Sequence, residues 1–107
     1  MQPEPRILPR ELKSRQDAGD APTLLDVRTS TERAIASLGG VHIPLDELSK
    51  RVAELDPTAE IVVFCHHGIR SAHAVSFLRA AGFSRARNLV GGIDQWSREI
   101  DPAVPMY

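Results

Sequence analysis

The sequence predicts one α/β domain in three layers, with a central, mainly parallel sheet of about five strands and helices on both faces. Short apolar stretches alternate along the chain with segments of helical periodicity, and this alternation favours parallel strands joined by crossover helices. The 107 residues give room for one core but not for two. A content of 42% apolar and 25% charged residues is typical of a globular domain.

The first half of the chain predicts two strands and three helices. A helix begins near Pro9 and ends at Gly19, and an apolar strand follows over Thr23–Val27. Ser30 is the expected N-cap of a second helix. A brief strand, "GVHIP", ends at Pro44. An amphipathic helix then follows from the helical spacing of its apolar residues, Leu45, Leu48, Val52 and Leu55.

The second half begins with the most apolar stretch, Glu60–Phe64, which has no alternation and predicts a central strand buried on both faces. A helical stripe follows, with Gly82 as its C-cap and Phe83 folding back onto the helix. The segment "ARNLV" predicts one more strand. Gly91-Gly92 then turns the chain into a last helix that packs Trp96 in the core. We expect a single domain over 1–107 with its core at about 7–100, a flexible N-terminus and a flexible tail at 101–107.

Composition excludes several classes of function. The net charge of −1 argues against a nucleic-acid binder. The N-terminus has no apolar h-region of a signal peptide, and no apolar run approaches the roughly 20 residues of a membrane span. The single cysteine cannot form an internal disulfide, so the expected location is the cytoplasm. No Asp or Glu lies between Ile61 and Ile93, which predicts either a solvated helix face or a locally positive surface around Cys65.

Cys65 lies where the central strand passes into the next helix, and we expect it to be a nucleophile. Ligands of open α/β sheets bind beyond the carboxyl ends of the strands. The following helix directs free N–H groups toward the loop, and Gly68 lets successive amides converge as an anion-binding nest. These amides and Arg70 favour the thiolate, which is the nucleophilic form. The alternative is a buried structural cysteine, although a core cysteine does not need a polar, glycine-containing loop after it.

The residues around Cys65 resemble those of rhodanese-like sulfurtransferases. "CHHGIRS" is similar to the active-site loop of that family, a cysteine followed by four residues and an arginine. "LLDVRTSTER", "VHIPLDEL" and "AGF…NLVGGIDQW" resemble three further family motifs in the expected order, from Leu24 to Trp96. One difference is "AIASLGGVHIP", where Ala36-Ser37-Leu38 replaces a Gly-His-Ile type stretch and one residue fewer precedes Pro44.

The resemblance implies a rhodanese-like fold and transfer of sulfane sulfur through a persulfide on Cys65. The donor would be a small anion such as thiosulfate or a persulfide-bearing protein, and the acceptor would be cyanide in an assay or a thiol or protein in the cell. No cofactor, metal, nucleic acid or membrane is implied. The substrate-binding residues would be the six that follow the cysteine, namely His66, His67, Gly68, Ile69, Arg70 and Ser71.

Other functions remain open at this point. A non-catalytic binding or regulatory module is one, although such modules can lose the cysteine that is intact here. A relay between two specific proteins is another. A thiolate phosphatase is a further alternative, but the loops of such enzymes resemble a cysteine and an arginine separated by five residues, and here four residues separate them. We also see no acid near the loop that could protonate the leaving group of a phosphate ester. A metal site on Cys65, His66 and His67 is disfavoured because neighbouring residues rarely point at one ion. A dithiol redox site would need a second cysteine.

Asp26 and Arg28 lie at the end of the neighbouring strand. We expect them to form a structural ion pair that fixes the following loop, and the alternative is that they reach the active site.

Overall fold

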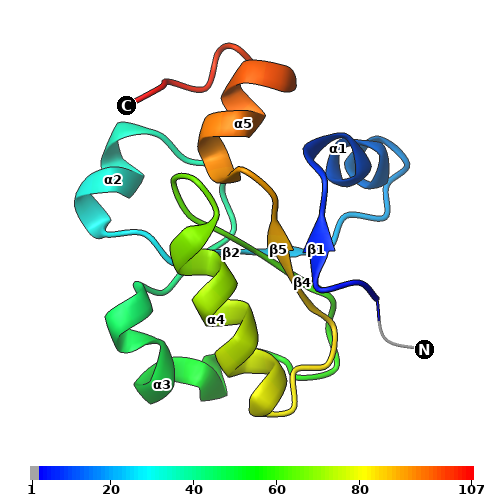
Figure 1. Ribbon diagram of the computed structural model, residues 1–107, viewed down its shortest axis with the longest axis vertical. Coiled ribbons are helices and arrows are strands. Elements are labelled where there is room, and N and C mark those ends of the chain that lie inside the picture. Colours follow the sequence, from blue (N-terminus) through cyan, green and yellow to red (C-terminus); the bar gives the residue numbers. More distant parts are fainter. Residues whose placement is uncertain (1–2) are drawn as a thin grey trace.

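The computed structural model describes residues 3–107 of the chain (Figure 1). The strands are β1 (Arg6–Ile7), β2 (Thr23–Asp26), β3 (Val41–His42), β4 (Ile61–Phe64) and β5 (Ala86–Leu89). The α-helices are α1 (Pro9–Asp17), α2 (Ser30–Ile35), α3 (Leu48–Arg51), α4 (Ile69–Ala80) and α5 (Gly92–Glu99), and α3 lies between the short 3₁₀ helices η1 (Leu45–Glu47) and η2 (Val52–Glu54). Among the described residues, no helix has the length and apolar character needed to cross a membrane.

The strands form one five-stranded parallel sheet in the order β1-β5-β4-β2-β3, as expected for an α/β domain. Central β4 is buried along its whole length, which confirms the prediction from its unbroken apolar run. Its register pairs Val63 with Leu25 of β2 on one side and with Asn88 of β5 on the other. The carboxyl ends of these strands therefore meet at one edge of the sheet.

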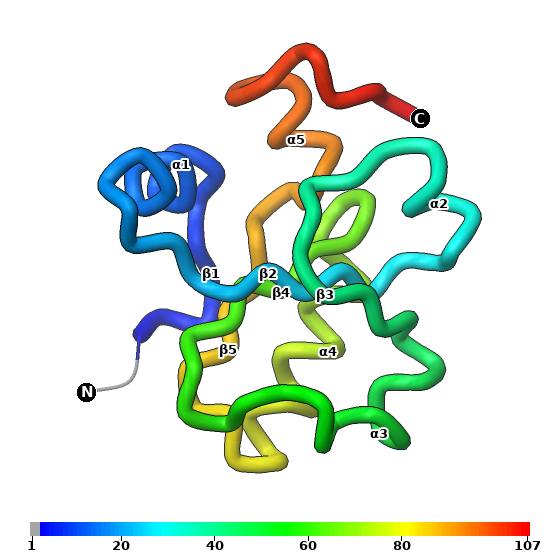
Figure 2. Tube along the Cα trace, turned by 180° about the vertical axis from the view of Figure 1, so that it is seen from behind, coloured from blue at the N-terminus to red at the C-terminus, as the bar shows by residue number. Residues whose placement is uncertain are grey.

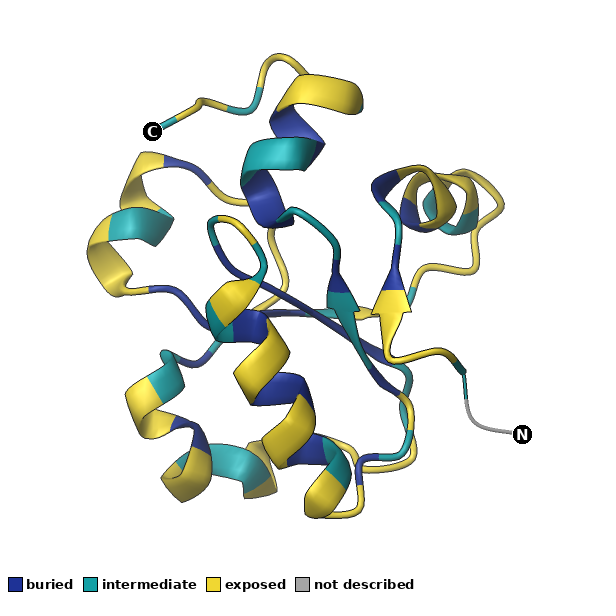
Figure 3. Cartoon of the chain, in the orientation of Figure 1, coloured by how far each residue is buried: buried dark blue, intermediate teal, exposed yellow. Residues whose placement is uncertain are grey.

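Helices cover both faces of the sheet, which gives the three layers (Figures 1 and 3). On one face, Leu48 of α3 and Leu78 of α4 pack against residues of β2 and β4. On the other face, Leu12 of α1 and Trp96 of α5 form a second core with Phe64. The chain leaves β2 toward α2, on the side of α5, and leaves β4 toward α4, on the opposite side (Figure 1). This divergence opens the crevice in which α/β domains bind ligands.

Two helix predictions need correction. The N-cap of α2 is Thr29, not Ser30, and Glu32 at N3 completes a capping box in which Glu32 N–H donates to Thr29 Oγ1 (3.2 Å) and Thr29 N–H donates to Glu32 Oε1 (3.3 Å). The predicted helix over residues 45–55 is interrupted, with 3₁₀ turns on both sides of α3. Its apolar stripe still faces the core, and short 3₁₀ turns are common at helix ends.

The end of α4 confirms its prediction. Gly82 has a φ of 99°, and Phe83 N–H donates to the carbonyl of Leu78 (2.9 Å) while Gly82 N–H donates to that of Arg79 (3.1 Å). This is a Schellman motif, which places Phe83 against the core.

Both ends of the described chain make more contacts than the sequence predicted. The two-residue strand β1 was not predicted as a strand, yet it pairs with β5 and buries Ile7. The segment 101–107, expected to be a loosely attached tail, runs back beside α2 (Figure 2). Val104 and Tyr107 pack against the core that contains Trp96. The tail therefore reaches the edge of the sheet where the chain leaves β2 and β4.

Candidate active site

The loop between β4 and α4 surrounds the Cys65 thiol with hydrogen-bond donors. Cys65 Sγ accepts hydrogen bonds from the backbone N–H of Gly68 (3.1 Å) and of Ser71 (3.4 Å), and it lies 3.3 Å from Ser71 Oγ. Gly68 is the N-cap of α4 with a φ of 101°, a left-handed conformation that favours glycine. The residue is 1% exposed, so the sulfur lies at the floor of the loop, at the N-terminus of a 12-residue helix.

This environment lowers the pKa of the Cys65 thiol. Burial acts in the opposite direction and raises it, but the Ser71 hydroxyl, the backbone amides of Ser71 and Gly68, and that of His67 stabilise the thiolate more. These donors, rather than Arg70, are the principal cause of the shift. A thiolate at neutral pH is the form required for nucleophilic attack.

Replacing Ser71 with alanine should raise the pKa of Cys65, because the variant keeps the backbone amide and loses only the hydroxyl donor. The ultraviolet absorbance of the thiolate, followed against pH, should have its midpoint at a higher pH than in the unmodified protein. The thiolate fraction at neutral pH should fall severalfold. A midpoint that stays in place or moves to lower pH would show that the hydroxyl does not stabilise the thiolate.

The first residues of α5 donate hydrogen bonds to the backbone carbonyls of the loop that holds Cys65. Ile93 N–H donates to the carbonyl of Cys65 (2.9 Å), and Asp94 N–H donates to that of His66 (3.1 Å). Gly92, which has a φ of 61°, lies so close that an added Cβ would be 2.4 Å from the Cys65 carbonyl oxygen. The sequence predicted Gly91-Gly92 only as a tight turn. The structure shows that Gly92 also allows α5 to bind the loop carbonyls, which leaves the loop amides free to face the sulfur.

Asn88 of β5 is a site residue that the sequence did not indicate. Its Nδ2 donates to the carbonyl of Gly68 (3.0 Å), and its Oδ1 lies 2.5 Å from Ser71 Oγ, so that Asn88 and the Cys65 thiolate compete for the single proton of that hydroxyl. One side chain therefore holds both Gly68 and Ser71, the two residues whose backbone N–H groups donate to Cys65 Sγ. Its role depends on the register of the parallel strands, which places the end of β5 beside that of β4 and which a sequence pattern does not reveal.

The Arg70 side chain pairs with a carboxylate from another helix, and its expected role in binding the substrate stays a prediction. Its guanidinium donates in a bidentate manner to Glu32 of α2, with distances of 2.6 and 2.8 Å. Tyr107 donates its hydroxyl proton to the same carboxylate (2.8 Å). Arg70 is the main cause that holds the pKa of Glu32 well below its usual range. Of the other predicted loop residues, Ile69 is 72% exposed at the rim.

Asp26 and Arg28 form a buried ion pair, as expected. Both side chains are 0% exposed, and Arg28 donates to the two carboxylate oxygens of Asp26 at 2.9 and 2.8 Å. Arg28 also donates to the carbonyl of Ala36 (2.6 Å) and to Tyr107 Oη (2.9 Å). It thereby closes the loop that differs from the family pattern and anchors the end of the chain.

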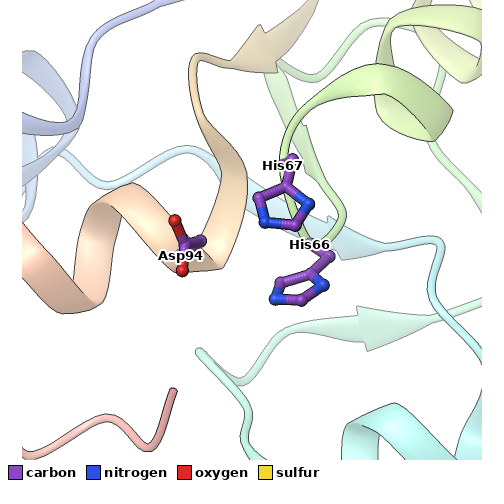
Figure 4. Close-up of side chains that lie close together, drawn as sticks. All are labelled: His66, His67 and Asp94. Atoms are coloured by element: carbon purple, nitrogen blue, oxygen red, sulfur yellow. The ribbon is translucent and has the colours of Figure 1, made fainter. Parts of the chain in front are cut away.

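His66 and His67 lie with Asp94 beside the loop (Figure 4). Their potential ligand atoms all lie within 4.8 Å of one another. The imidazole rings are stacked, however, with centroids 3.9 Å apart and an interplanar angle of 27°, and Tyr107 stacks on the other side of His66 at 3.9 Å. In-plane lone pairs of stacked rings run side by side rather than converging on one ion. Burial, together with His67, lowers the pKa of His66.

The expectation that no acid lies near the loop is wrong. Glu32 and Asp94 both lie near the loop although the sequence window around it contains no acid, so the case against a phosphatase now depends on loop length alone. Of the two alternatives for this window, the positive surface is disfavoured, because three of its four arginines pair with acids in the described part of the chain. Arg85 and Arg87 pair with Glu60, which precedes β4 and so lies at the edge of the sheet opposite Cys65, and Arg70 pairs with Glu32.

Comparisons with known proteins agree with this geometry. The family model of the rhodanese-like domain matches residues 8–99. The adenylyltransferase and sulfurtransferase MOCS3-1 of Zea mays is 37% identical over 110 residues, which cover 95% of this chain and 24% of that protein. The chain therefore spans about a quarter of the length of this relative.

Two solved structures share the whole fold. A rhodanese-related protein from Thermoplasma volcanium has a TM-score of 0.83 and 32% identity, covering 97% of this chain and 100% of that one. The human single-domain sulfurtransferase TSTD1 has a TM-score of 0.81 and 27% identity, covering 91% and 98%. With its family match, its fold and its cysteine loop in agreement, the chain belongs to the rhodanese-like domain family.

Proposed function

We propose that this domain is a sulfurtransferase that carries sulfane sulfur as a persulfide on Cys65. The observation that supports it most directly is the arc of donors around Cys65 Sγ, at the N-terminus of α4. Such an arc stabilises a sulfur anion without a cofactor, and the same loop amides, from His66 to Ser71, would hold the outer sulfur of the persulfide. Two of the similar proteins are named as sulfurtransferases.

The reaction would proceed by double displacement. The Cys65 thiolate attacks the outer sulfur of the donor, and the sulfur–sulfur bond of the donor breaks. Thiosulfate then releases sulfite with the bonding electron pair. A protonated persulfide releases its carrier as a thiolate with that electron pair, and the carrier then takes the proton of the transferred sulfur, which leaves a thiol and the persulfide anion on Cys65. In the second step, the acceptor attacks the outer sulfur on Cys65 and regenerates the thiolate. Cyanide would leave as thiocyanate in an assay, and a thiol or an acceptor protein would take the sulfur in the cytoplasm.

Intact mass after incubation with a donor tests this function. Thiosulfate, and separately the persulfide of a small uncharged thiol such as N-acetylcysteamine, should add one sulfur atom, about 32 Da, to Cys65. Cyanide should remove it. The Cys65→Ser variant should gain no mass under the same conditions. If neither donor adds sulfur while the thiol still reacts with an alkylating agent, the domain is a binding or regulatory module instead.

A further inference from the structure

The ion pair with Glu32 neutralises the positive charge of Arg70 beside the loop that surrounds Cys65. Both terminal nitrogens of the guanidinium donate to the carboxylate, at 2.6 and 2.8 Å. A bidentate pair of this kind uses the planar fork by which arginine binds oxyanions. Glu32 is itself held in place, because it caps α2 and accepts a hydrogen bond from Tyr107. An incoming anion would have to compete with a fixed carboxylate for the same donors.

Other cations at this edge of the sheet are also paired. Arg28 and Arg33 both donate to Asp26, at 2.8 and 3.3 Å. Thiosulfate carries two negative charges. When the Cys65 thiolate attacks it, three negative charges come together. An uncharged thiol carries its persulfide with at most one charge, and the reactive protonated form carries none. The electrostatic cost of the first step is therefore larger for thiosulfate wherever no free cation compensates it.

The surface beside Arg70 is largely apolar, and Arg70 is the one cation among the residues that line it. Ile69 is 72% exposed at the rim of the loop. Arg70 itself lines a hollow of about 300 Å³, together with Val27, Thr29, Pro44, Leu45 and Asp46. Such a surface suits an uncharged, partly apolar body attached to the donor sulfur.

We propose that Glu32 is a specificity-determining residue, which occupies Arg70 and so selects persulfides of uncharged thiols over small dianionic donors such as thiosulfate. This inference rests on the proposed function and specifies its donor. Glu32 acts through Arg70 and does not contact the reacting sulfur atoms.

The Glu32→Gln variant tests the inference with little risk to the fold, because glutamine also completes a capping box. Single-turnover rate constants for sulfur addition to Cys65 should be measured with thiosulfate and with N-acetylcysteamine persulfide. Their ratio, thiosulfate over persulfide, should rise about tenfold in the variant, since the freed guanidinium can bind an oxyanion. Adding Arg70→Ala to Glu32→Gln should remove that gain. A general loss of stability would lower both rate constants alike, so it cannot account for a rise in their ratio.

Glu54→Gln is the matched control, because Glu54 also forms a bidentate pair with an arginine, Arg51, but on an exposed 3₁₀ turn. It should leave the ratio as it is. Ionic strength gives a test without a variant: in the unmodified protein, added salt should speed the reaction with thiosulfate by screening repulsion between anions. An unchanged ratio in Glu32→Gln, or a rate with thiosulfate that falls with salt, would overturn the inference. Failure of both donors in the unmodified protein would instead overturn the proposed function.

Discussion

Replacing Gly92 with alanine should destabilise the domain and displace the loop that holds Cys65. An added Cβ would lie 2.4 Å from the Cys65 carbonyl oxygen and 2.5 Å from that of His66, and both are backbone atoms that cannot move without the loop. The hydrogen bonds that Ile93 and Asp94 donate to these carbonyls would be lost with the displacement. The φ of 61° adds strain of about 1–2 kcal/mol for any L residue.

Gly19→Ala separates the contact from the backbone strain. Gly19 has a φ of 74°, and an added Cβ there would meet nothing within 4 Å. Urea unfolding should show a loss of about 1 kcal/mol for Gly19→Ala. For Gly92→Ala, the loss should be larger by at least about 2 kcal/mol, as expected for overpacking against rigid backbone.

Sulfur addition to Cys65 should separate the two variants even more. With the loop displaced, Gly92→Ala should slow persulfide formation by roughly a hundredfold or more, since small misplacements of reacting groups have large effects on rate. Gly19→Ala should leave that rate unchanged. Equal stability and equal rates in the two variants would show that the loop accommodates the extra methyl group.

Features of the fold that depend on neighbouring residues were predictable. Four consecutive apolar residues before Cys65 indicated a strand buried on both faces, and the structure places it at the centre of the sheet. Gly82 and Phe83 indicated the end of α4. The position of Cys65 also followed, because a strand, a glycine loop and a helix in succession fix where the loop lies. Strand β1 was missed because two residues are too short to show a periodicity.

Contacts between distant segments were not predictable from local pattern. Glu32 reaches Arg70 from 38 residues away, and Tyr107 reaches Glu32 from 75 residues away. A window of sequence without acids therefore need not lie in a positive environment, because other segments bring carboxylates to it. Asn88 likewise supports the loop from the neighbouring strand, and its partners are set by register rather than by sequence spacing.

Replacing Asp26 with asparagine should produce the other large loss of stability. Asp26 and Arg28 are both fully buried, and the carboxylate accepts from the backbone N–H, Nε and Nη2 of Arg28. Asparagine has nearly the same shape but carries no charge, and one of its two terminal atoms is a donor that would face another donor. Breaking a buried pair by removing one partner typically costs 3–5 kcal/mol. This is a large part of the roughly 5–15 kcal/mol that stabilises a domain.

Two controls show whether the burial of the pair is the cause. Arg33→Gln removes the partly exposed arginine that also donates to Asp26 and leaves the buried pair intact, so its effect on the free energy of unfolding should be much smaller. Glu54→Gln breaks an exposed pair with Arg51, and its urea midpoint should equal that of the unmodified protein within error. If Asp26→Asn were no more destabilising than Arg33→Gln, Arg28 would have to find other partners or water on losing the carboxylate. The segment from Val27 to Ala36, which contains α2 and which Arg28 now closes through the Ala36 carbonyl, would then be held by its backbone and not by this ion pair.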